Sequence, residues 1–217
     1  SCAHRSTVVN PDYVPRSVDN GVLLIPDFQE DSFIKDLDRY ESDGNVSRKQ
    51  YFDLFVTNLK QSFKDASSFA TVEYVSITPQ PTLVEKELPL EDETITFSLP
   101  EKKVELKNRN HGVILFLEDL SLSLVKKQKE ATTSARSYAV NGVSGRDAKL
   151  YQVDVFKYYV VLESEYVLYD NSLFDFVSYG RISLRKRYKA RAPLEESVKH
   201  IIADFSKKII DGTPFQQ

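Results

Sequence analysis

The sequence feature that most constrains the fold is a pair of long alternating segments near the carboxyl terminus. In the expected strand 151–169, even-numbered positions form an apolar face that only Ser164 interrupts. These positions are Phe156, Tyr158, Val160, Leu162, Tyr166 and Leu168. The residues Asp170-Asn171-Ser172 favour a turn, and residues 176–188 are able to return as a second strand. The pattern therefore predicts a long β-hairpin with one hydrophobic face.

The same alternation predicts the register of this hairpin. A pairing centre near residues 172–173 keeps both apolar sets on one face, whereas a slip of one residue would separate them. The apolar pairs in this register are Leu162 with Leu184 and Tyr158 with Tyr188. Glu165 then lies opposite Arg181, and Glu163 lies diagonally from Arg185.

Two segments, 47–65 and 193–210, have the spacing of amphipathic helices. Ser47 and Gln50 have the spacing of a capping box, and Pro193 suits a first helical position. The apolar stripe of the first segment is Phe52, Phe55, Val56, Leu59 and Phe63. That of the second segment is Leu194, Val198, Ile201, Ile202, Phe205 and Ile209. We expect both helices to pack on a sheet through these stripes.

Further strands are expected at 22–25, 69–77 and 113–117, the last continuing through Leu120, Leu122 and Leu124. Residues 79–110 are harder to interpret: 95–99 has the pattern of a short strand, and 104–106 fits a strand or a helix. The fold class is therefore α/β (α+β). We expect a mixed β-sheet of about five strands, a long C-terminal hairpin and two main amphipathic helices, in a single domain over 21–217.

Composition and motifs argue against several functions. The formal charge of −3 gives no general reason to expect nucleic acid, and no apolar stretch is long enough to span a bilayer. The sequence has no nucleophile elbow, phosphate loop or zinc spacing, and His4, His111 and His200 do not form a catalytic pattern. We therefore expect no enzyme, cofactor or metal site. Asp119, at the end of a buried strand, is the carboxylate to inspect for a perturbed pKa.

The chain has a single cysteine, Cys2, which cannot form an internal disulfide. Its context, Ser1-Cys2-Ala3 followed by a polar run, resembles the end of a bacterial lipobox. This resemblance implies that Cys2 is the lipidation site and that residues 1–20 are a flexible lipoprotein tether. Ala3 after the cysteine implies sorting to the outer membrane in a bacterium that follows the proteobacterial rule. The alternative is an ordinary surface cysteine.

The order of elements resembles a group of envelope lipoproteins. The residues that carry the resemblance are 22–26, 59–75, 113–117, the hairpin 166–180 and the closing helix. The group includes the curli-secretion lipoprotein, the activator lipoproteins of penicillin-binding proteins and the amino-terminal domain of TolB. The resemblance implies a non-catalytic lipoprotein of the bacterial envelope, at the outer membrane and facing the periplasm. Residues 126–150 are basic and polar, which is unlike the lipid-facing hairpin of a pore.

Two functions remain open. The first is a protein-binding or assembly factor with an envelope protein partner, attached to the membrane through Cys2. The second is a carrier of a lipid or another small apolar ligand. An apolar cavity of several hundred cubic ångströms would favour the carrier, and a flat basic or aromatic patch would favour the partner binder.

The strand that follows the hairpin turn has a basic stripe at odd positions. Its members are Arg181, Arg185, Arg187, Lys189 and Arg191. Glu163 and Glu165 on the neighbouring strand are able to neutralise part of it, with Arg181 as a structural counter-charge. We therefore expect an anionic-partner patch to centre on Arg187, Lys189 and Arg191.

Replacing Cys2 with Ala in the full precursor is expected to release the protein from the membrane fraction, because the acyl chains anchor it. Fractionation of cells that express each form measures this. Retention of the variant in the membrane fraction would contradict the lipid anchor.

Overall fold

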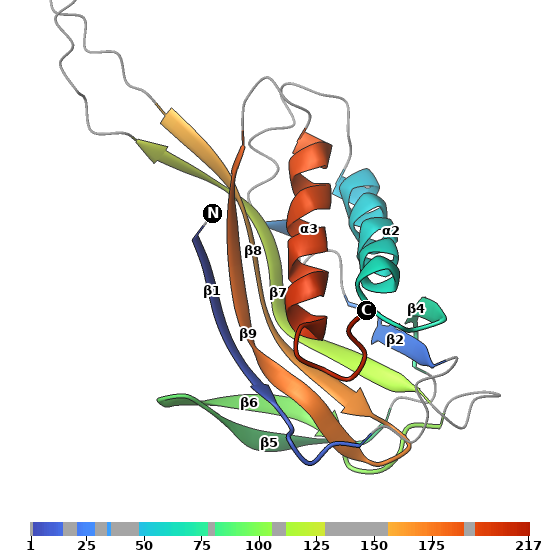
Figure 1. Cartoon of the computed structure of the whole chain (residues 1–217). Helices are drawn as coiled ribbons and strands as arrows, with labels where there is room; N and C mark the ends of the chain where they lie inside the picture. Colours follow the sequence, from blue (N-terminus) through green and yellow to red (C-terminus); the bar gives the residue numbers. More distant parts are fainter. Residues whose placement is uncertain are drawn as a thin grey trace, which may run out of the picture.

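The computed structural model describes residues 2–14, 21–28, 34–35, 48–77, 81–105, 112–128, 156–188 and 194–217. The strands of its large sheet are β1 (Cys2–Val9), β2 (Val22–Pro26), β3 (Ile34–Lys35), β4 (Thr71–Val75), β7 (Val113–Gln128), β8 (Phe156–Asp170) and β9 (Asp175–Tyr188). A separate hairpin consists of β5 (Leu83–Leu90) and β6 (Glu93–Pro100), and the two named helices are α2 (Arg48–Ala66) and α3 (Leu194–Ile210). Figure 1 shows α2 and α3 side by side on one face of a curved sheet, with β5–β6 on the other side.

The sheet is mixed, with strand order β1-β9-β8-β7-β2-β4 and with the short β3 paired to β7. Strands β1, β9, β8 and β7 are antiparallel neighbours, whereas β2 is parallel to both β7 and β4. The predicted α+β class, the C-terminal hairpin and the two helices are confirmed. The number of strands exceeds the expected five because the amino-terminal residues and the two residues of β3 also join the sheet.

The predicted hairpin is β8–β9, and its register is the expected one. The pairs Leu162–Leu184, Tyr158–Tyr188 and Glu165–Arg181 all face each other. At the turn, the Asp170 carboxylate accepts hydrogen bonds from the backbone N–H groups of Ser172 and Leu173. The Tyr13 hydroxyl donates a further bond to Asp170 at 2.8 Å, and both residues are buried.

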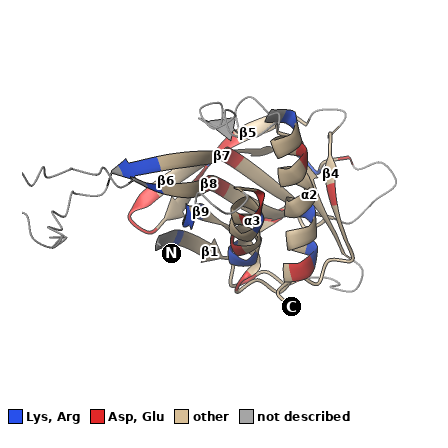
Figure 2. Cartoon of the chain, turned by 90° about the horizontal axis from the view of Figure 1, so that it is seen from above, with Lys and Arg blue, Asp and Glu red and all other residues tan. Residues whose placement is uncertain are grey.

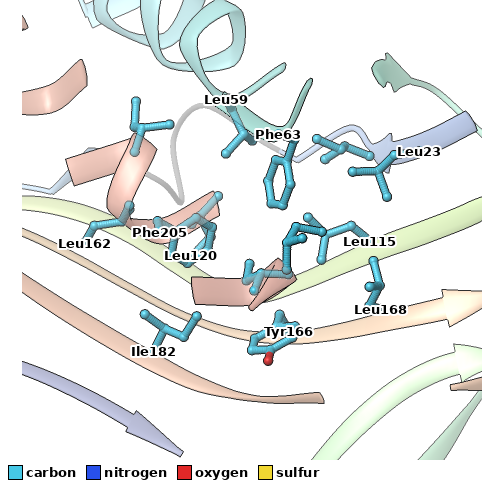
Figure 3. Packing of buried hydrophobic residues seen from close by; sticks show 14 of the residues in the cluster. Leu23, Leu59, Phe63, Leu115, Leu120, Leu162, Tyr166, Leu168, Ile182 and Phe205 are labelled. Atoms are coloured by element: carbon cyan, nitrogen blue, oxygen red, sulfur yellow. The ribbon is translucent and has the colours of Figure 1, made fainter. Parts of the chain in front are cut away.

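The main core lies between the helices and the sheet (Figure 3). In Figure 3, Leu59 and Phe63 of α2 and Phe205 of α3 point toward side chains of the strands. The predicted packing is confirmed, since Phe55, Leu59, Ile202 and Phe205 all have an exposed fraction of 0%. Each helix therefore packs its expected apolar stripe on the sheet, with Phe52, Val56 and Leu194 only partly buried.

A second core lies between the opposite face of the sheet and the β5–β6 hairpin. The hairpin contributes Leu88, Leu90, Ile95, Phe97 and Leu99, and the sheet contributes Val167, Tyr169 and Tyr179. The expected strand at 95–99 is part of β6, while β5 was not predicted. Val104 is neither strand nor helix: the Asn171 side chain bonds both its backbone N–H, at 2.8 Å, and its carbonyl, at 2.9 Å.

The interpretation of residues 1–20 as a flexible tether is wrong for residues 2–9. These residues form β1, an edge strand paired along its whole length with β9. Arg5 donates to the carbonyl of Asp211, and Thr7 accepts from the Tyr166 hydroxyl. Backbone pairing does not require an apolar pattern, which explains why a polar run forms this strand. Residues 15–20 lie outside the described part of the chain.

One glycine permits the close approach of β1. A Cβ atom at Gly180 would lie 2.1 Å from the carbonyl oxygen of Ser6. Because this neighbour is backbone, β1 would have to move to accommodate any side chain at that position.

Replacing Phe55, Leu59, Ile202 or Phe205 with Ala is expected to reduce the free energy of unfolding by about 2–5 kcal/mol each. The physical reason is the loss of buried apolar contact together with the cavity left behind. Urea denaturation measures the change. The matched control is Lys60→Ala on the exposed side of α2, for which a change within about 0.5 kcal/mol is expected. Core variants as stable as this control would contradict the packing.

Candidate anionic-partner surface

The predicted basic stripe lies on the sheet face opposite the helices. The even positions Val160, Leu162, Ile182 and Leu184 belong to the core beneath α2 and α3. Because neighbouring residues of a strand point to opposite faces, the odd positions 157–165 and 181–187 lie on the other face. The β5–β6 hairpin packs on this face near Tyr179, next to the turn. The cations near the end of β9 and the start of β8, away from the turn, are not covered by this hairpin contact.

Arg181 is neutralised by carboxylates, as expected for a structural counter-charge. Its guanidinium donates to Glu165 on β8 and, at 2.7 Å, to Glu93 on β6. These bonds raise the pKa of Arg181, chiefly through Glu165. Arg181 therefore links the sheet to the hairpin and contributes little free charge to the surface.

Arg185 has a different environment. Its guanidinium carbon lies 3.9 Å from the ring centroid of Tyr159, which is a cation–π distance. Its Nε and Nη2 atoms are buried and donate no hydrogen bond within the described part of the chain. Glu163, the expected diagonal partner, accepts a hydrogen bond from the Ser183 hydroxyl at 2.7 Å. The charge of Arg185 is therefore stacked on an aromatic ring and has no carboxylate partner among the described residues.

Two lysines extend this positive surface across the neighbouring strands. Lys127 on β7 pairs directly with Lys157 on β8, and Tyr159 pairs with Arg187 on β9. Like charges directly opposite each other in a sheet repel, so the Lys127–Lys157 pair concentrates positive potential at a cost in stability. Arg187 and Lys127 are exposed, and Lys157 is partly exposed. Neither lysine was predicted for the patch. Lys127 lies in 126–150, which was expected to be a polar excursion and not part of β7. Lys157 lies in the expected strand 151–169, but its place beside Lys127 depends on the β7–β8 register.

We call Lys127, Lys157, Tyr159, Arg185 and Arg187 the basic sheet end. Figure 2 shows blue segments at the far end of β7 and on β9, on the side where β1 begins. Of the predicted patch, Arg187 belongs to this surface, whereas Lys189 and Arg191 lie outside the described residues. Arg187 is thus the one residue of the predicted patch that the described structure places on this surface. Residues of β7 and β8 join it there.

The other residues singled out in the sequence are dispersed. The backbone of Cys2 pairs with Arg185, and that of His4 pairs with Ser183. His200 is exposed on α3, and His111 lies outside the described residues. Within the described ranges, no group of three or more His, Cys, Asp or Glu residues is arranged to hold a metal ion.

Asp119 is exposed at a β-bulge in β7, where its φ is 48°. The pKa of the neighbouring Glu118 is raised. Burial is the main cause, and it outweighs the hydrogen bond that the Ser98 backbone N–H donates to Glu118 at 2.9 Å. Charges on Asp119, Glu165 and Glu85 add to the increase.

A shallow hollow lies beside the β5–β6 hairpin. Its volume is about 130 Å³, and it is lined by Pro81, Thr82, Glu101, Lys102, Lys103, Val104 and Glu105. Pockets for small ligands usually measure about 300–1,000 Å³ and are mostly apolar. This hollow is small and largely charged, so it does not support the carrier function.

The sequence matches no protein-family model, and no curated protein is significantly similar to it. Among the helices that the structure describes, none has the length and apolar character needed to cross a membrane.

Replacing Glu118 with Gln is expected to stabilise the protein at neutral pH. Because the folded-state pKa is raised, the folded state takes up a proton more readily than the unfolded state, and stability falls as pH rises through that pKa. Glu118→Gln removes this loss of stability, because glutamine does not ionise. The difference in free energy of unfolding between variant and wild type should shrink as pH is lowered toward the ordinary pKa of a glutamate. Urea denaturation over a pH series measures the difference.

The matched control is Glu87→Gln, an exposed carboxylate on β5 of the hairpin whose Ser98 bonds to Glu118. It is expected to show no comparable advantage at neutral pH. An equal response of both variants would contradict the assignment to burial of Glu118.

Proposed function

We propose that this chain is a non-catalytic lipoprotein of the bacterial envelope that binds an anionic partner through the basic sheet end. The observation that carries the proposal is the cluster of Lys127, Lys157, Arg185 and Arg187, none of which has an ion pair among the described residues. Unpaired cations gathered on one sheet face create a positive potential that attracts anions. Arg181 on the same sheet face is different, because Glu93 and Glu165 neutralise its charge and it serves a structural role.

The lipobox-like context of Cys2 supports the proposed place in the cell. An acylated Cys2 would hold the protein at the outer membrane, facing the periplasm, as in the envelope lipoproteins that the order of elements resembles. An accessory or assembly role suits a protein that acts by binding. The carrier alternative receives no support from the small, charged hollow beside the hairpin.

Reversing the charge of Lys127, Lys157 and Arg187 together to Glu is expected to abolish salt-sensitive binding to washed envelope membranes. These side chains are exposed or partly exposed, so the loss should come from electrostatics and leave the fold intact. Cosedimentation of the purified chain with the membranes, over a series of salt concentrations, measures the binding. Circular dichroism verifies the fold of each variant.

The matched control reverses three exposed lysines of the helix layer: Lys60, Lys64 and Lys199. The net charge changes equally in both variants, so only the position of the charge differs. Loss of binding in the first variant alone supports the proposal. If the first variant binds as the wild type does at every salt concentration, the basic sheet end is only a solvated surface and the proposal is wrong.

A further inference from the structure

Strand β1 leaves no flexible segment between Cys2 and the sheet. The backbone of Cys2 pairs with Arg185, and the pairing continues without interruption to Val9 opposite Ser178. In an antiparallel sheet, the Cα atoms of directly opposite residues are about 4.5–5.5 Å apart. Any group attached to Cys2 is therefore held beside the basic sheet end and not at the end of a long tether.

The register places the cations next to this position in adjoining rows of the sheet. Cys2 shares a row with Arg185, the next row contains Arg187 and Tyr159, and the row after that contains Lys157 and Lys127. Neighbouring strands lie about 4.8 Å apart, and alternate residues along a strand about 7 Å apart. All four cations therefore lie within a patch no wider than a few lipid headgroups, with Cys2 at its edge.

We propose that the basic sheet end rests on the anionic phospholipid headgroups of the bilayer that holds the Cys2 anchor. This inference rests on the proposed function, since it names the anionic partner of the same surface. A membrane is favoured over an acidic protein because acyl chains on Cys2, whose backbone pairs with Arg185, would bring headgroups next to the cations before any other partner arrives. Tyr159 also suits an interface, where one end of an aromatic side chain is apolar and the other is wet.

The proposal fixes the orientation of the molecule at the membrane. The end of β7, the start of β8 and the end of β9 face the bilayer. They do so through the sheet face that carries the basic sheet end. The α2–α3 layer lies on the opposite side of the sheet, so it is directed away from the bilayer. Exposed lysines of that layer, Lys60 and Lys199, therefore remain in contact with water.

The first experiment measures binding of the chain, without lipid on Cys2, to phosphatidylcholine vesicles and to vesicles of phosphatidylcholine and phosphatidylglycerol in equal amounts. Cations near an anionic surface each contribute about a fivefold gain in binding. The triple variant Lys127→Gln, Lys157→Gln and Arg187→Gln should therefore bind the anionic vesicles about a hundredfold less tightly. The control variant Lys60→Gln, Lys64→Gln and Lys199→Gln should bind as the wild type does.

The second experiment tests the orientation. Cys2 carries the only thiol of the chain, so a maleimide phospholipid attaches it specifically to a vesicle. Amine labelling, read by mass spectrometry, should then be slower at Lys127 and Lys157 than at Lys60 and Lys199 on anionic vesicles. This protection should be lost as salt is raised, and on phosphatidylcholine vesicles, which carry no net charge, it should be absent at every salt concentration.

The outcomes separate this inference from the proposed function. Selective binding to anionic vesicles together with protection of Lys127 and Lys157 supports the membrane-facing orientation. If the vesicles are not bound but the charge-reversal variant still loses envelope binding, the anionic partner is a protein or another polymer, and this inference is overturned. If neither binding is affected by the variants, both this inference and the proposed function are wrong.

Discussion

Burial of β8 on both of its faces is the constraint on which the rest of the structure depends. Four consecutive residues, Tyr166 to Tyr169, have exposed fractions of 2% or less. Tyr166 and Leu168 face the helices, whereas Val167 and Tyr169 face the β5–β6 hairpin. A sheet segment that is apolar on both faces requires a layer on each side. The three-layer arrangement follows from this stretch of sequence.

The layers differ in how far they extend along the strands. The helix layer contacts the even positions of β8 from Val160 to Leu168, while the hairpin contacts Val167 and Tyr169, near the turn. Beyond the hairpin, the odd positions of β8 and β9 have no apolar layer among the described residues, and most of them are charged. Arg181 stands at the boundary, where it bonds to Glu93 of the hairpin and to Glu165 of the sheet. The position of the hairpin thus divides one sheet face into an apolar part and a basic part.

The parts of the fold that the sequence predicted are those with strong periodicity. Alternation set the β8–β9 register, and helical spacing identified the buried faces of α2 and α3. Strand β5 was missed because its pattern is weak: Glu85, Lys86 and Glu87 are exposed, and only Leu88 and Leu90 are buried. Strand β1 was missed because an edge strand is held by backbone hydrogen bonds, which leave no hydrophobic signature.

The candidate surface could be predicted only in part for a related reason. Arg187 belongs to a stripe that is visible within one strand, whereas Lys127 joins it through pairing between strands distant in sequence. Such neighbours depend on the register of β7 with β8, and the bulge between Glu118 and Ser121 shifts that register. A bulge changes which residues share a face without changing composition, so local pattern alone does not reveal it.

Pairing of β1 with β9 also has a consequence for the order of folding. The partners, such as Cys2 with Arg185, are separated by most of the 217 residues. Closing so long a loop is entropically unfavourable until the intervening chain is compact, so contacts of this kind form late. Strand β1 is therefore expected to join its edge of the sheet late. Until then β9 presents an open edge, with which another strand is able to pair in place of β1.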